Sequence, residues 1–223
     1  SEAERAAADA VPVEARIHGP IVELNAPYVA EMARLEMVQR FGDAALTEGY
    51  RVTTTVDSRL QAAADAAARR TLLAYDRRHG YRGAAARLDA SLLGDPKAVV
   101  DALRQYPNRG GLAAGVVESV QDRSAIVRRR DGVAIELGWD DLSWARPALP
   151  DDVLGPAPKA AGDVLAPGDV VYLEPMPEGR HRLAQVPVVA GALVALEPRD
   201  GAIVALVGGF DFGGSKYNRA VQA

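Results

Sequence analysis

Side chains able to do chemistry are few and scattered along this sequence of 223 residues. It contains no cysteine, which excludes a thiolate nucleophile, a cysteine-ligated zinc and a disulfide. His18, His79 and His181 lie far apart, and none has a second histidine or a carboxylate at the spacing of a metal motif. We therefore expect three structural histidines, no metal and no cofactor.

Two acidic pairs, Asp140-Asp141 and Asp151-Asp152, could supply the carboxylates of an acid–base catalyst. Adjacent residues on a loop point apart, however, and acidic loops are common because charge keeps a surface solvated. We interpret both pairs as solvated. A self-contained hydrolase that uses a carboxylate pair stays open as an alternative function.

Six arginines lie between positions 69 and 87, and three of them, Arg77, Arg78 and Arg82, form a candidate anion-binding face. Cations are also favoured at the C-terminal end of a helix, because they face the negative end of its dipole. Runs of charge usually form an exposed face. A solvated helix end is therefore the preferred interpretation.

Three aromatic residues, Trp139, Trp144 and Tyr172, are candidate partner-docking residues, although a core position is favoured for at least one tryptophan. Residues 110–187 carry eight basic and twelve acidic side chains. A groove that follows a phosphate backbone needs the opposite balance. The count disfavours a second alternative, an OB-type module that binds single-stranded nucleic acid.

The elements that must position these residues begin with helices. The composition, 48% hydrophobic and 25% charged with a net charge of −4, is that of a globular protein. Large apolar residues at helical spacing predict a helix over 28–41, with Pro27 in its first turn and Gly42 at its end. The β-branched run 51–56 predicts a strand.

A second, alanine-rich helix is predicted to follow this strand and to end near His79. Asp57 or Ser58 can cap its first turn, and Ser58 and Gln61 have the spacing of a capping box, in which the two side chains bond reciprocally to the backbone.

Short β-rich runs alternate with turns from about position 112 onward, and Asp131-Gly132 is typical of a two-residue hairpin turn. About five strands in so short a stretch indicate a small OB-like β-barrel. The apolar runs 192–196 and 202–207 predict a hairpin buried on both faces. The expected fold is α+β: an OB-like β-barrel insert, a helical linker segment and a terminal β-hairpin.

Several stretches resemble the class A penicillin-binding proteins. The segment 49–61, GYRVTTTVDSRLQ, resembles the strand-to-helix segment after their glycosyltransferase domain, and 27–37 resembles the helix before it. The block 75–83, YDRRHGYRG, looks like the entry to the OB-like insert of the 1A type. The hairpin region 191–212 and the tail 216–223 resemble the first hairpin of the transpeptidase domain.

The resemblance implies a fragment of a bifunctional peptidoglycan synthase that faces the periplasm from the bacterial inner membrane. The implied parts are a linker over 1–48, a strand–helix segment over 49–80, a non-catalytic OB-like domain over 81–187 and a transpeptidase hairpin over 188–223. The family's acylated serine lies in a Ser-x-x-Lys motif, but no serine of this sequence has lysine three residues later.

No catalytic residue is therefore expected here, and the implied role is that of a regulatory and docking segment. The implied partners are the parent's own glycosyltransferase and transpeptidase domains and an outer-membrane lipoprotein activator, with no nucleic acid. Membrane attachment would come only through an N-terminal anchor outside this sequence.

Overall fold

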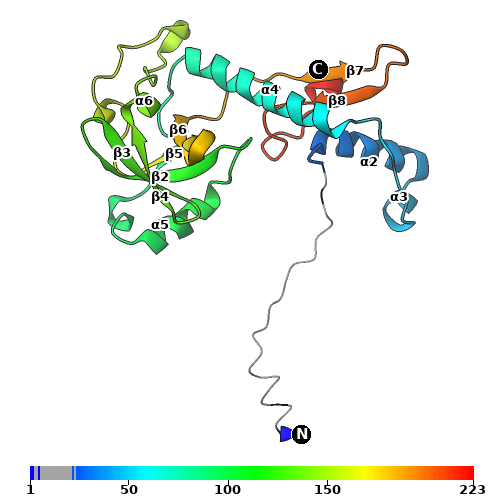
Figure 1. The fold of residues 1–223 in the computed structure, drawn as a ribbon, viewed down its shortest axis with the longest axis horizontal. Coiled ribbons are helices and arrows are strands. Elements are labelled where there is room, and N and C mark those ends of the chain that lie inside the picture. The colour runs from blue at the N-terminus through cyan, green and yellow to red at the C-terminus, as the bar shows by residue number, and fades with distance from the viewer. Residues whose placement is uncertain (3–4, 6–21, 23) are drawn as a thin grey trace.

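The computed structural model describes residues 1–2, 5, 22 and 24–223, and it combines helices with antiparallel strands. An OB-like unit built on a sheet lies at one end of these residues, and a small hairpin with further helices lies at the other (Figure 1). The long helix α4, Ser58–Arg78, connects the two. The α+β class is confirmed. Of the linker predicted over 1–48, residues 3–4, 6–21 and 23 lie outside the described residues.

Helix α2 spans Pro27–Phe41, where the sequence predicts a helix. Pro27 occupies the first helical position, where its missing N–H costs nothing. Gly42, with a φ of 58°, ends the helix, because this left-handed conformation favours glycine. The short helix α3, Ala44–Thr47, follows directly.

The side chain of Asp57 caps α4 by accepting hydrogen bonds from the N–H groups of Arg59 (2.9 Å) and Leu60 (3.1 Å). The capping box predicted for Ser58 and Gln61 is wrong. The Gln61 side chain instead reaches the backbone of a strand 145 residues further along the chain. The side chain of Gln61 thus bonds to a distant strand and not to the first turn of its own helix.

The predicted strand over 51–56 is also wrong, since these residues are part of no strand. Thr55 Oγ1 donates to the carbonyl of Ile203 (2.7 Å), and the N–H of Asp57 donates to the carbonyl of Val204 (3.0 Å). β-Branched residues favour extended backbone, but a strand also needs a neighbouring ladder.

The OB-like unit is a six-stranded antiparallel sheet in the order β1-β5-β2-β3-β4, with β6 paired to β5. The sheet is open rather than a closed barrel, because β4 and β6 are not hydrogen-bonded to each other. Their bounds are β1 Ala86–Arg87, β2 Ala113–Val120, β3 Ser124–Arg129, β4 Ala134–Gly138, β5 Asp169–Pro175 and β6 His181–Ala184.

The turn between β3 and β4 is longer than the two-residue connection predicted from Asp131-Gly132. Arg129 pairs with Val133, and three residues lie between them. Gly132 adopts a φ of 84°, as expected for a glycine that closes such a turn.

Short helices connect the strands of the OB-like unit. They are η1 Ala90–Leu92, α5 Pro96–Ala102, η2 Leu103–Gln105, α6 Trp139–Leu142, η3 Pro150–Asp152, η4 Ala161–Asp163 and η5 Pro177–Gly179.

Both faces of this sheet are covered by apolar side chains. One face carries the main core, in which Val127, Leu137 and Leu173 are fully buried. On the other face, Val99 of α5 and Leu103 pack against β2 and β5 and are equally buried. A strand buried on both faces needs no alternation of polar and apolar residues, which explains the continuous burial of positions 114–117 in β2.

The second sheet is the hairpin of β7, Leu193–Leu196, and β8, Ile203–Val207. The face that meets α4 is covered, whereas the opposite face is covered only in part: Leu206 is 1% exposed there, but Val194 and Leu196 remain 43% and 55% exposed. A last short helix, α7, spans Arg219–Gln222. Within 24–223 and the few described residues before them, no helix has the length and apolarity to cross a bilayer.

Candidate interaction sites

The three candidate docking aromatics do not form one patch. Trp139 and Trp144 are half-buried against the main core of the OB-like unit, whereas Tyr172 packs against two other apolar clusters. The guanidinium of Arg123 lies 4.6 Å from the centre of the Trp139 ring, and that of Arg77 lies 5.3 Å from the centre of the Trp144 ring. Each tryptophan ring therefore makes a cation–π contact with one arginine, and such a contact contributes about 0.5–1 kcal/mol at an exposed site.

Two of the three candidate anion-binding arginines already have carboxylate partners. Arg77 donates to Glu174 (2.7 Å), and Arg82 donates to both oxygens of Asp76 (2.9 and 3.1 Å). Arg78 is exposed, and its guanidinium lies 5.8 Å from the ring centre of Tyr75. The three cations therefore do not converge on a common anion site, and an anion-binding role for them stays a prediction.

Neither Asp76 nor Gln185 stands out in the sequence as a candidate interaction residue. Both are buried, at 2% and 8% exposure, where α4 meets the OB-like unit. Their partners are 100 or more residues away in several cases, so no local pattern could have identified them.

The two histidines of the described residues are structural. His79 stacks on Tyr75 and bonds to its carbonyl through Nδ1 (2.8 Å), and His181 Nε2 lies 2.8 Å from Nη1 of Arg129. His18 lies outside the described residues. Within those residues, no group of three or more histidine, aspartate or glutamate side chains is arranged to hold a metal.

Partial burial, followed by the positive charge of Arg129, holds the pKa of His181 below its usual range, while the backbone of Gly179 and the charge of Asp131 act in the opposite direction. The folded chain thus binds the proton less readily than the unfolded chain. We expect the contribution of His181 to the stability of the OB-like unit to be fully present well above about pH 6.5 and to be lost as the pH drops below it.

This expectation can be checked by urea unfolding at about pH 8 and about pH 5.5. The unfolding midpoint of the unchanged chain should fall more on acidification than that of His181→Gln. Equal shifts in the two proteins would show that His181 does not contribute.

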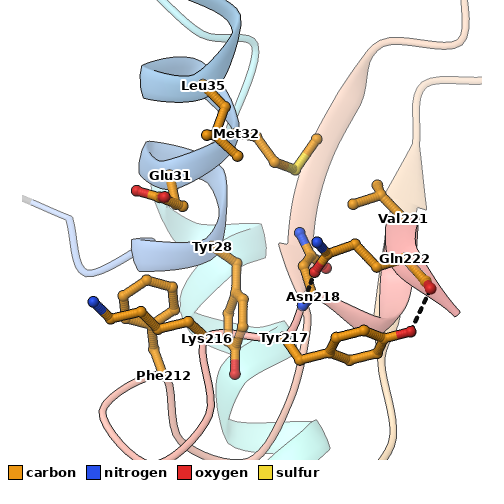
Figure 2. Close-up of a pocket in the computed structure, with 10 residues that line it drawn as sticks. All are labelled: Tyr28, Glu31, Met32, Leu35, Phe212, Lys216, Tyr217, Asn218, Val221 and Gln222. Atoms are coloured by element: carbon orange, nitrogen blue, oxygen red, sulfur yellow. Dashed lines mark hydrogen bonds between the residues drawn. The ribbon is translucent and has the colours of Figure 1, made fainter. Parts of the chain in front are cut away.

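A groove of about 360 Å³ lies between α2 and the C-terminal residues (Figure 2). Apolar and aromatic side chains form most of its wall, and Glu31 and Lys216 add opposite charges. Its apolar lining is Tyr28, Met32, Leu35, Phe212, Tyr217 and Val221.

Tyr28 anchors one side of this groove. Its ring meets Phe212 edge-on at 5.0 Å, and its hydroxyl donates to the carbonyl of Ser215 (3.0 Å). Burial raises the pKa of Tyr28. Asn218 is 6% exposed, and its N–H donates to Oε1 of Gln222 (2.7 Å). The residues that line this groove include no serine, cysteine or histidine.

Comparison with known proteins assigns the family. The penicillin-binding protein OB-like domain matches residues 81–189. Penicillin-binding protein 1A of Pseudomonas aeruginosa is 45% identical over 212 residues, which are 95% of this chain and 25% of that protein. Penicillin-binding protein 1A of Vibrio cholerae is 44% identical and covers all of this chain, with 28% of its own length.

A solved structure supports the same assignment. The crystal structure of penicillin-binding protein 1A from Haemophilus influenzae matches 100% of this chain and 31% of its own, with a TM-score of 0.81 and 34% identity. The chain spans about a quarter of the length of the curated relatives it matches. Because likeness in sequence and in structure extends over the whole chain, it belongs to the class A penicillin-binding proteins of the 1A type.

Proposed function

We propose that this chain is a non-catalytic regulatory and docking segment of a bifunctional peptidoglycan glycosyltransferase and DD-transpeptidase that builds the cell wall. The observation that carries the proposal is the OB-like domain at 81–189 inside a chain that aligns throughout with penicillin-binding protein 1A. A module of this kind, held on a long helix beside a hairpin, is suited to receiving a partner.

The domain assignment is part of this proposal. Residues 1–48 serve as the linker after a glycosyltransferase domain, and 49–80 pack on a transpeptidase domain. Residues 81–187 form the OB-like module, and 188–223 supply the first transpeptidase hairpin. The apolar strand face that leaves Val194 and Leu196 exposed supports this role, because a transpeptidase domain would cover it.

The proposed partners are the protein's own two catalytic domains and an outer-membrane lipoprotein activator that docks on the OB-like module. The proposed location that goes with these partners is the periplasmic side of the inner membrane. Among the candidate docking residues we favour Trp139, because a half-buried tryptophan beside Arg123 has the character of an interface hot spot.

The two alternatives are less well supported. The acidic balance over 110–187 opposes a single-stranded nucleic-acid module. For a hydrolase, Asp141 is bound to Arg180 (3.1 Å) rather than aimed at a second free carboxylate. Asp151 and Asp152 lie exposed on a turn, both with φ near 60°.

The proposal is tested by fluorescent penicillin. The purified chain should give no covalently labelled band, because no serine in it has the lysine that activates the family's nucleophile. Full-length penicillin-binding protein 1A of Haemophilus influenzae, assayed beside it, is the positive control. A labelled band of this chain that excess unlabelled penicillin removes would overturn the proposal.

A further inference from the structure

The segment that enters the OB-like unit and the segment that leaves it are hydrogen-bonded to each other. Gln185, in the segment that leaves the unit, donates through Nε2 to the carbonyl of Gly80 (2.7 Å). Its Oε1 accepts from the N–H of Arg82 (2.9 Å), on the way in. Because Gln185 is 8% exposed, water competes little for these bonds. The entering and the leaving segment are therefore held together, and they form a single attachment of the OB-like unit to the rest of the chain.

Asp76 of α4 fixes this attachment to the helix. Its carboxylate binds both Nη atoms of Arg82 and also accepts from the N–H of Val188 (3.2 Å). Arg82 in turn donates to the carbonyl of Val186 (2.9 Å). One buried carboxylate therefore holds the entering and the leaving segment together, and bidentate geometry makes the pair directional.

A second polar contact lies one residue further along α4. Arg77 donates to Oε2 of Glu174 in β5, and the same oxygen accepts from Arg182 of β6 (2.7 Å in each case). The guanidinium of Arg77 also lies against Trp144. Glu174 and Arg77 are only 19% and 24% exposed, so this ion pair is screened less than a surface pair.

Apolar contacts close the remaining side of the joint. Leu72 and Leu73 of α4 share a buried cluster with Leu112 and Ala184 of the OB-like unit and with Phe210, which follows β8. Gly110 lets Phe210 approach closely: a Cβ built on this glycine would lie 2.4 Å from the Phe210 ring. The OB-like unit is thus held by α4 and by the segment after the hairpin at once.

The other end of α4 is fixed equally firmly to the hairpin. Ala64 packs on Ala205 and Val207 of β8, and Gln61 bonds to both backbone groups of Leu206. Between these two attachments, the sequence of α4 contains neither glycine nor proline, and the 21 residues of the helix extend about 32 Å. A helix of this kind transmits a displacement instead of absorbing it.

We infer that α4 couples the OB-like unit rigidly to the β7–β8 hairpin, with Asp76 as the residue that sets the angle of the OB-like unit. The inference rests on the proposed docking function, because it specifies how a partner bound to the OB-like unit acts on the rest of the protein. A displacement of the OB-like unit on partner binding would be transmitted through α4 to the β7–β8 hairpin.

Paired spin labels can measure this rigidity in the chain as it stands. The sequence has no cysteine, so Ala66→Cys on α4 and Gln121→Cys on the turn after β2 introduce the only two labelling sites. Both positions are exposed. Pulsed electron paramagnetic resonance should give one narrow distance distribution, and Asp76→Asn should lose it in favour of a broad one.

Asp101→Asn is the matched control, since it removes an exposed carboxylate of α5 paired with Arg104 and should leave the narrow distribution intact. Both tryptophans lie in the OB-like unit, so their fluorescence shows whether that unit remains folded. If Asp76→Asn unfolds it, Arg82→Gln tests the same pair from its partly exposed side.

A broad distribution in the unchanged chain overturns the inference, and so does a narrow one in folded variants that lack the Asp76–Arg82 pair. Neither result depends on penicillin or a docking partner. Failure of the joint is therefore distinguishable from failure of the proposed function, which penicillin labelling decides.

Discussion

Replacing Gln61 with leucine should lower the free energy of unfolding by about 2–4 kcal/mol. The Gln61 side chain is 1% exposed, and its amide both donates to the carbonyl of Leu206 (3.0 Å) and accepts from the Leu206 N–H (2.9 Å). Leucine matches its size but offers no polar atom. It would leave two buried backbone groups of β8 without partners, and each such loss costs about 1–3 kcal/mol.

The measurement is urea unfolding followed by far-UV circular dichroism, with hydrogen exchange at the Leu206 amide as a local readout. Gln39→Leu, which changes an exposed glutamine of α2, is the matched control and should shift the unfolding midpoint little. Similar midpoints for the two variants, or an unchanged exchange rate at Leu206, would contradict the role assigned to Gln61.

Local signals in the sequence predicted the two longest helices, α2 and α4. Pro27 and Gly42 bracket α2, and the Asp57 carboxylate caps α4, because these effects act within a few residues. The α+β class follows from the same local reasoning, since an alanine-rich helix and short β-rich runs differ in composition. Sheet closure does not follow from it, because closure depends on whether two edge strands meet.

The residues that join the parts were out of reach of such reasoning. Gln61 looked like the second half of a capping box, and Arg82 looked like a member of a basic run. Their true partners, Leu206 and Asp76, became visible only in three dimensions. A buried polar residue must find a partner, but the sequence does not say how far away that partner is.

The same limit applies to the candidate interaction residues. Arginines near the end of a helix resemble an anion site whether or not carboxylates face them, and here Glu174 approaches Arg77 from 97 positions away. The resemblance to a known family was more informative than any single motif, because it used the order of several stretches along the whole chain.

Replacing Leu173 with alanine should destabilise the OB-like unit by about 2–5 kcal/mol. Leu173 is fully buried in β5, at the centre of the sheet, where it pairs with Ala113 of β2 and Leu183 of β6. Alanine would leave a cavity that three hydrogen-bonded strands cannot close without breaking their register. Tryptophan fluorescence during urea unfolding measures the effect, because Trp139 and Trp144 pack against the same core.

Leu196→Ala removes the same atoms from the exposed face of β7, where the leucine is 55% exposed, and should cost less than about 0.5 kcal/mol. The pair of variants therefore separates burial from side-chain chemistry. Equal losses in the two proteins would mean that Leu173 is not a core residue of the OB-like unit. A large loss confined to Leu173→Ala, with the far-UV transition shifted alongside the fluorescence, would further mean that the OB-like unit and the helical part of the chain unfold in one cooperative transition.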